Sequence, residues 1–159
     1  MIRSEKRLGE ILIERGWVGE RELQTALSES TEVGKFFGML LVKKGCITEN
    51  QLMSALSEQF RIPHVSVKSF YIDWDLVNKF SRTLVCEHSC FPLRREGRTV
   101  TLGITNPLDA WALTKAAEEA RGQEVKFALV NQSEMEELLM RYRKQVKGNI
   151  SQLLDQEEE

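Results

Sequence analysis

The chain has 159 residues, 42% of them hydrophobic, which is enough for the core of one ordinary domain or two small ones. Its 22 Lys and Arg and 24 Asp and Glu give a net charge of -2, and no basic block predicts a DNA or RNA polymer as partner. The N-terminus is too charged for a signal peptide, and no apolar run reaches the roughly 18 residues of a membrane-spanning helix, so we expect a cytoplasmic protein that does not span a membrane.

The first sixty residues contain one 24-residue unit twice. Residues 7–30 and 36–59 align at an offset of 29 with nine identities, and five residues separate them. The identical pairs are Gly9/Gly38, Leu12/Leu41, Gly16/Gly45, Glu20/Glu49, Leu23/Leu52, Ala26/Ala55, Leu27/Leu56, Ser28/Ser57 and Glu29/Glu58. The chain therefore begins with a tandem repeat.

Each copy of the unit predicts a helix, a turn and a second helix. Residues 7–15 and 36–44 have apolar positions at helical spacing. Gly16 and Gly45 follow them, at the place where a left-handed residue closes a helix. Each unit is thus expected to start with a short helix that ends at a glycine.

The second helix of each copy is expected to have a narrow apolar face. Thr48, with Gln51 three residues on, predicts a capping box, and Gly19 is the weaker cap in the first copy. The apolar face consists of Leu23, Ala26 and Leu27 in the first copy and of Leu52, Ala55 and Leu56 in the second. Two units are too few for a solenoid, so we expect the hairpins to pack about a pseudo-twofold axis. Neither second helix carries the cluster of Arg, Lys and Asn that reads DNA bases.

The character of the sequence changes after residue 60. Pro63 precedes a short β-branched run that predicts a connector ending in a strand near residues 64–67. Residues 74–88 have apolar positions at helical spacing and predict a helix. A domain boundary is therefore expected between residues 60 and 61.

Strands and helices then alternate. Residues 90–105 predict two strands around a turn at Glu96 and Gly97. A helix over 107–120 is expected to follow, with Asn106 as its cap and Pro107 in the first turn. Residues 124–130 predict a strand, because they are rich in β-branched and aromatic side chains.

A capping box of Ser133 and Glu136 predicts a last helix to about residue 146. A strand-helix-strand step implies a right-handed crossover in a small mixed sheet. The predicted fold is α+β: tandem helical hairpins over 1–60, a mixed sheet packed with helices over 61–147, and an acidic tail or linker over 148–159.

Residue patterns of catalysis are absent from the sequence. It contains no phosphate-binding loop, no dinucleotide fingerprint, no nucleophile elbow and no zinc-protease motif. Cys86 and Cys90 are one helical turn apart, but only Cys46 and His64 remain to complete a four-ligand zinc site. We therefore expect free thiols, no metal, no cofactor and no enzymatic activity.

The repeat resembles a known family. Its pattern, R-L-G-x-x-[LVI]-[LVI]-x-x-G-[LVI]-[LVI]-x-x-x-x-L-x-x-x-L-x-x-Q, is similar to that of the N-terminal MshEN-type domain of type II secretion and type IV pilus assembly ATPases (the GspE/PilB family). The likeness continues through "FPLRREGRTVTLGITNPLDAWAL" and "SEMEELLMRYRK", so that it covers about residues 5–146. It implies a regulatory and docking domain that stands before a hexameric ATPase absent from this chain.

The resemblance also implies two binding functions. The first is docking to the cytoplasmic domain of an inner-membrane platform protein, which would recruit the chain to that membrane. The alternative is a sensor of cyclic di-GMP, a twofold ligand that two matching surfaces suit.

The resemblance assigns the cyclic di-GMP site position by position. The predicted residues are Arg7, Leu8, Gly9, Leu23 and Leu27 from the first copy, Phe37, Gly38, Leu52, Leu56 and Gln59 from the second, and Asp109 from the later half. This chain departs from the family pattern at two places: Ser30 replaces Gln, and Phe36-Phe37 replaces Arg-Leu. A phenylalanine can stack on a base but supplies no cationic donor.

Overall fold

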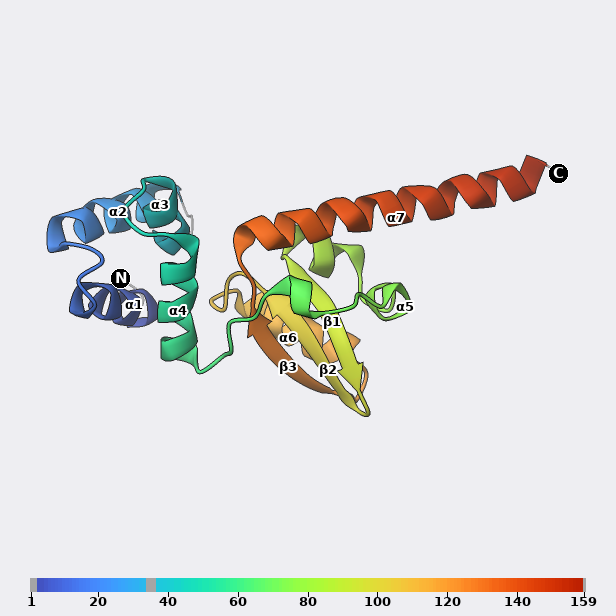
Figure 1. The fold of residues 1–159 in the computed structure, drawn as a ribbon, viewed down its shortest axis with the longest axis horizontal. Coiled ribbons are helices and arrows are strands. Elements are labelled where there is room, and N and C mark those ends of the chain that lie inside the picture. The colour runs from blue at the N-terminus through green and yellow to red at the C-terminus, as the bar shows by residue number, and fades with distance from the viewer. Residues whose placement is uncertain (1–2, 34–36, 159) are drawn as a thin grey trace.

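We analysed a computed structural model, which describes residues 3–33 and 37–158 of the 159-residue chain. Four helices form one end of the molecule, a sheet with its helices forms the middle, and the last helix extends past the sheet (Figure 1). The predicted α+β class is confirmed. Within the described ranges, no helix combines the length and the apolar character needed to cross a membrane.

The helical half contains the two predicted helix-turn-helix units. They are α1 (Arg3–Glu14) with α2 (Glu20–Val33), and α3 (Phe37–Lys43) with α4 (Glu49–Phe60). Gly16 and Gly45 have φ of +73° and +77°, which a side chain would make unfavourable, so both predicted glycine stops are confirmed.

The capping box of α4 is confirmed as well. Thr48 accepts from the backbone N–H of Gln51, and the Gln51 side chain accepts from the Thr48 N–H. In the first copy, Glu22 accepts from the Gly19 N–H at 3.4 Å. Because Gly19 has no side-chain acceptor, only half of this reciprocal arrangement is possible there.

The two units pack in a crossed manner that fits the predicted pseudo-twofold axis. Helix α1 packs on α4, and α2 packs on α3, so that the first helix of each unit contacts the second helix of the other. The ion pairs repeat the same relation: Arg15 binds Glu58, and Lys44 binds Glu29 at 2.7 Å. The offset of 29 residues relates Arg15 to Lys44 and Glu29 to Glu58.

We expect Gly9→Ala to destabilise the protein by about 1–3 kcal/mol, because it overfills a packed contact. A Cβ atom at Gly9 would lie 2.8 Å from Cδ2 of Leu23, whose side chain is buried. Urea unfolding measures the loss. Gly148→Ala is the control: its Cβ would meet nothing within 4 Å, and alanine should raise stability by about 0.5–1 kcal/mol in a helix. Equal stability of both variants would contradict the contact.

The sheet half is built on three strands. These are β1 (Cys90–Glu96), β2 (Thr99–Ile104) and β3 (Glu124–Leu129). They lie in the order β1-β2-β3, with β1 and β2 antiparallel and β2 and β3 parallel. Helix α6 (Ala110–Glu119) makes the crossover from β2 to β3. The predicted mixed sheet and the turn at Gly97, whose φ is +60°, are confirmed.

The connector between the halves differs from the prediction. No strand covers 64–67; His64 makes a single bridge to Leu129 at the end of β3, and Val67–Ser69 form a 3-10 turn, η1. The predicted helix over 74–88 is split into α5 (Trp74–Val77) and a π-helical turn, η2 (Thr83–Glu87).

The split has a tertiary cause. The Ser81 N–H and hydroxyl both donate to the Glu119 carboxylate of α6, and the Ser81 hydroxyl in turn accepts from the Leu84 N–H. These hydrogen bonds prevent the backbone between α5 and η2 from continuing as one α-helix. A helical apolar period in the sequence does not reveal a partner 38 residues away.

The boundaries of the last two helices also shift. Asp109, not Asn106, caps α6, because Asn106 accepts from the Leu108 N–H and makes a turn around Pro107. Helix α7 (Gln132–Glu158) begins before the predicted Ser133 box and runs past residue 146. The predicted domain boundary at 60/61 stays a prediction.

Candidate functional site

The structure places most leucines of the predicted nucleotide site in the core. Leu8, Leu52 and Leu56 are fully buried, and Leu23 is 8% exposed. Burying a leucine side chain contributes about 1.5–3 kcal/mol to the stability of the fold. They stabilise the packed hairpins and present almost no surface to a ligand.

The remaining residues of that prediction are distributed unevenly. Gly9 faces Leu23, and Gly38 is buried on α3. Leu27 in the middle of α2 and Gln59 near the end of α4 are half-buried. Arg7 and Phe37 belong to α1 and α3, but their side chains lie outside the described part of the structure.

Asp109 belongs to the sheet half. Its carboxylate accepts from Nδ1 of His88 at 2.7 Å and from the Ala112 N–H, so it caps α6 and orients the imidazole. His88 in turn stacks on the half-exposed Trp111, with ring centroids 4.2 Å apart. These contacts belong to the sheet half, and the eleven predicted residues stay a prediction as a set.

A shallow hollow of about 620 Å³ lies on the first hairpin. It is lined by Ile13 of α1 and by Glu20, Arg21, Leu23, Gln24 and Thr25 of α2. Among the residues with described side chains, Leu23 is the one that the hollow shares with the predicted site. The hollow combines an apolar wall with a guanidinium, which suits an anion with an apolar body.

A polar joint connects the helical half to the sheet half. The Glu49 carboxylate of α4 accepts from the Ser133 N–H at 3.0 Å and from the Ser133 hydroxyl at 2.8 Å. Asn50 accepts from the Asn131 amide at 2.9 Å, and the Asn131 oxygen lies 2.7 Å from Nε2 of His64. Glu49 thereby caps the N-terminus of α7 from the other half, where a negative charge is favourable.

Sequence reasoning missed this joint, although the repeat contains a signal for it. Glu49 is one of the identical positions of the repeat, and its equivalent, Glu20, lines the hollow. The same residue type therefore has two different environments. The 84 residues that separate Glu49 from Ser133 make the contact invisible to local patterns.

We expect Glu49→Ala to lower the free energy of unfolding by about 1–2 kcal/mol, the usual cost of losing a cap. Glu20→Ala is the matched control, because it removes the equivalent exposed carboxylate and should change stability by at most about 0.5 kcal/mol. Thermal unfolding of both variants measures the difference. If the two variants have the same melting temperature, the hydrogen bonds of Glu49 do not stabilise the contact between the helical half and the sheet half.

The described residues include no cluster of three or more His, Cys, Asp or Glu side chains that could hold a metal ion. Cys46, Cys86 and Cys90 are free thiols. Burial raises the pKa of Cys90 to about 12, with smaller contributions from Glu119 and Asp109. Its thiol is therefore protonated at neutral pH and is a poor nucleophile.

One segment of the sheet half presents an aromatic side chain to solvent. Tyr71 is 96% exposed, whereas Phe70 is half-buried and Ile72 is 6% exposed. Phe70 has extended backbone angles, so consecutive side chains point to opposite sides. Burial of its two neighbours therefore fixes Tyr71 outward.

The segment around Tyr71 is anchored at both ends. Glu134 of α7 accepts from the Ser66 hydroxyl at 3.1 Å and from the Val67 N–H at 3.0 Å. On the other side, Asp73 caps α5 by accepting from the N–H groups of Asp75 and Leu76. Tyr71 is thus an exposed aromatic on a rigid support.

Comparison with known proteins gives one family and several similar folds. The family model described as the MshEN domain matches residues 60–149. Among curated proteins, none matches the sequence.

The similar solved structures include MshE with cdg, the abbreviation of cyclic di-GMP. It has a TM-score of 0.75 at 24% identity, over 86% of this chain and 98% of that one. The N-terminal domain of XpsE has a TM-score of 0.70 at 20% identity, over 89% and 96%. The same domain in crystal form I4122 has a TM-score of 0.56 at 21% sequence identity, over 89% of this chain and 97% of that one. At these identities the likeness concerns the fold.

Proposed function

Since this chain belongs to the family of MshEN domains, the N-terminal domains of GspE/PilB-type ATPases, we propose that it is a docking and regulatory domain of such a motor. It acts in the cytoplasm and binds the cytoplasmic part of an inner-membrane platform protein of type II secretion or type IV pilus assembly. Its own task is binding, and the chemistry of ATP hydrolysis belongs to another domain of the family.

The observation that carries the docking role is Tyr71 on its anchored segment. Tyrosine is enriched among the residues that dominate binding energy at protein interfaces. An aromatic side chain held outward by buried neighbours loses little conformational entropy when a partner covers it. The sheet half therefore offers a prepared contact for another protein.

The docking role is tested by binding of the purified chain to the cytoplasmic domain of the platform protein from the same organism. We expect a complex that is stable enough to be recovered in a pull-down and to give a dissociation constant by calorimetry. Recovery of no complex, with both proteins shown to be folded, would contradict the docking role.

Cyclic di-GMP binding is the second candidate, and the pseudo-twofold packing of the repeat favours it. The ion pairs Arg15–Glu58 and Lys44–Glu29 occupy equivalent positions in the two copies, so the two copies present similar surfaces. A ligand with two identical halves can make the same contacts with each. MshE, which shares this fold, has a solved structure with that ligand. Of the predicted residues whose side chains are described, Leu27 and Gln59 are only half-buried.

Calorimetric titration with cyclic di-GMP tests the second candidate. We expect binding that Arg7→Ala weakens roughly tenfold to hundredfold, the value of one charge-assisted hydrogen bond. Arg98→Ala, in the turn between β1 and β2, removes the same charge from the sheet half and is the control. Absence of heat at high micromolar ligand would exclude sensing, and equal affinity of Arg7→Ala and wild type would remove Arg7 from the site.

A further inference from the structure

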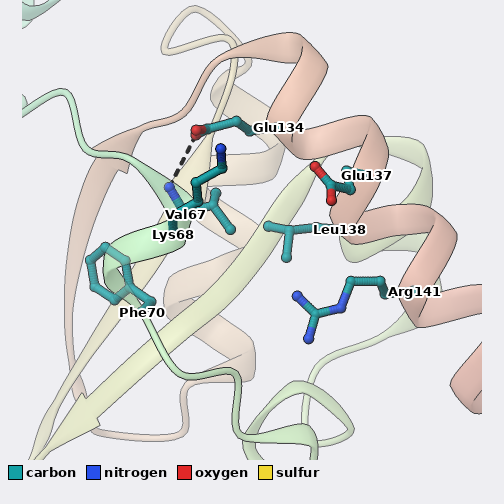
Figure 2. A pocket seen from close by; sticks show the side chains of 7 residues that line it. All are labelled: Val67, Lys68, Phe70, Glu134, Glu137, Leu138 and Arg141. Atoms are coloured by element: carbon teal, nitrogen blue, oxygen red, sulfur yellow. Dashed lines mark hydrogen bonds between the residues drawn. The ribbon is translucent and has the colours of Figure 1, made fainter.

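A pocket of about 280 Å³ opens between η1 and the first half of α7 (Figure 2). Its lining residues are Val67, Lys68, Phe70, Glu134, Glu137, Leu138 and Arg141. The volume is at the lower end of ligand pockets, so it fits one large side chain and its neighbour better than a dinucleotide.

The walls of the pocket are held in place by contacts outside it. Glu134 ties η1 to α7 through its bonds to Ser66 and Val67. The Arg141 guanidinium lies over the Trp74 ring, 5.7 Å from its centroid. Trp74 packs edge-on against the buried Phe91 at 6.1 Å. The pocket is therefore formed before any partner arrives.

The charges at the rim favour a carboxylate. Neither Lys68 nor Arg141 forms an ion pair with a carboxylate of the described residues. Glu134 is already engaged by two donors, which leaves Glu137 as the remaining acidic side chain. Figure 2 shows the Arg141 guanidinium below the Leu138 side chain, on the other side of the pocket from Lys68.

The floor of the pocket favours an apolar side chain. Phe70 and Val67 are half-buried on one wall and supply the apolar surface, whereas Leu138 on the other wall is almost fully buried. An apolar side chain inserted between these walls would be removed from contact with water, which is favourable. A carboxylate on the neighbouring residue would reach the charged groups of Lys68 and Arg141. Glu137 would then accept a backbone N–H, which a peptide offers and a free carboxylic acid does not.

We propose that this pocket anchors a short segment of the platform protein in which an apolar or aromatic residue stands next to Asp or Glu. The inference rests on the proposed docking function and states which kind of peptide segment the docking site selects. The apolar side chain occupies the space between Phe70 and Leu138, and the carboxylate pairs with Arg141 and Lys68. Tyr71, the next residue after Phe70, points to the opposite side of the chain and does not line the pocket.

The test measures binding of the platform protein's cytoplasmic domain to the full chain and to two double variants. Lys68→Gln with Arg141→Gln removes the pocket cations and should weaken binding at least tenfold, with a reduced salt dependence. Arg143→Gln with Lys147→Gln removes two exposed charges of α7 outside the pocket and should bind like wild type. Circular dichroism and thermal unfolding establish that all three proteins are folded.

The outcomes separate the two proposals. If wild type binds and the two double variants bind equally, the pocket does not hold the segment, and docking itself stands. If wild type does not bind, docking and the pocket assignment fall together.

A photo-cross-linker identifies the segment directly. With p-benzoylphenylalanine in place of Glu137, an exposed residue that lines the pocket, we expect the captured peptide to contain an apolar residue beside Asp or Glu. A captured peptide without a carboxylate would overturn the assignment.

Discussion

Replacing Leu52 by alanine is expected to lower the free energy of unfolding by about 2–5 kcal/mol, the range for deleting a fully buried leucine side chain. Leu52 has no exposed surface and belongs to the core that joins the two hairpins. The change would be a large part of the total stability of a small domain. Urea unfolding, followed by circular dichroism with the slope m held in common, measures it.

Leu154→Ala is the matched control for Leu52→Ala. Leu154 is 56% exposed on α7, so its truncation should change stability by at most about 0.5 kcal/mol. The pair also distinguishes the two roles that the repeat pattern allows for Leu52. A variant that unfolds like wild type but no longer binds cyclic di-GMP would show a ligand contact in place of a core residue.

Tyr71→Ala is expected to weaken binding of the platform protein's cytoplasmic domain by about 2 kcal/mol, or roughly 30-fold, as for a central aromatic at an interface. It should leave the melting temperature nearly unchanged, because the side chain is 96% exposed. Calorimetry of the complex and thermal unfolding of the free chain together measure both effects.

Two variants control for Tyr71→Ala. Tyr71→Phe keeps the ring and should retain most of the affinity if the ring carries the contact. Met140→Ala removes another exposed apolar side chain, which is 56% exposed on α7 and does not line the pocket. If Tyr71→Ala binds as well as wild type does, the docking contact lies elsewhere on the molecule.

Local signals in the sequence were sufficient for the helical half. Glycine at positions 16 and 45 has the left-handed conformation expected after a helix, because only glycine adopts it without a Cβ penalty. The Thr48 capping box forms from residues three apart. The offset of 29 also relates the two ion pairs, so the pseudo-twofold packing was already present in the repeated sequence.

The candidate cyclic di-GMP site stays a prediction, because a leucine pattern does not state what covers it. Leu8, Leu52 and Leu56 have the spacing of a core and of a ligand surface alike, and their burial identifies the core. Lys68 and Tyr71 come from the segment where the expected strand and helix gave way to η1 and α5, whereas Arg141 lies on α7. No periodic pattern indicates a pocket between η1 and a helix that starts more than sixty residues later.

The sequence by itself determined the repeat and the glycine stops and capping box of the helical half, since these depend on backbone preferences and on side chains a few residues apart. Only the tertiary structure decided that Glu49 caps α7, that Ser81 interrupts a helix, and that Tyr71 stays outside while its neighbours are buried. These features depend on hydrogen bonds and burial between distant segments. Such contacts exist only after the chain has folded and water has left the core.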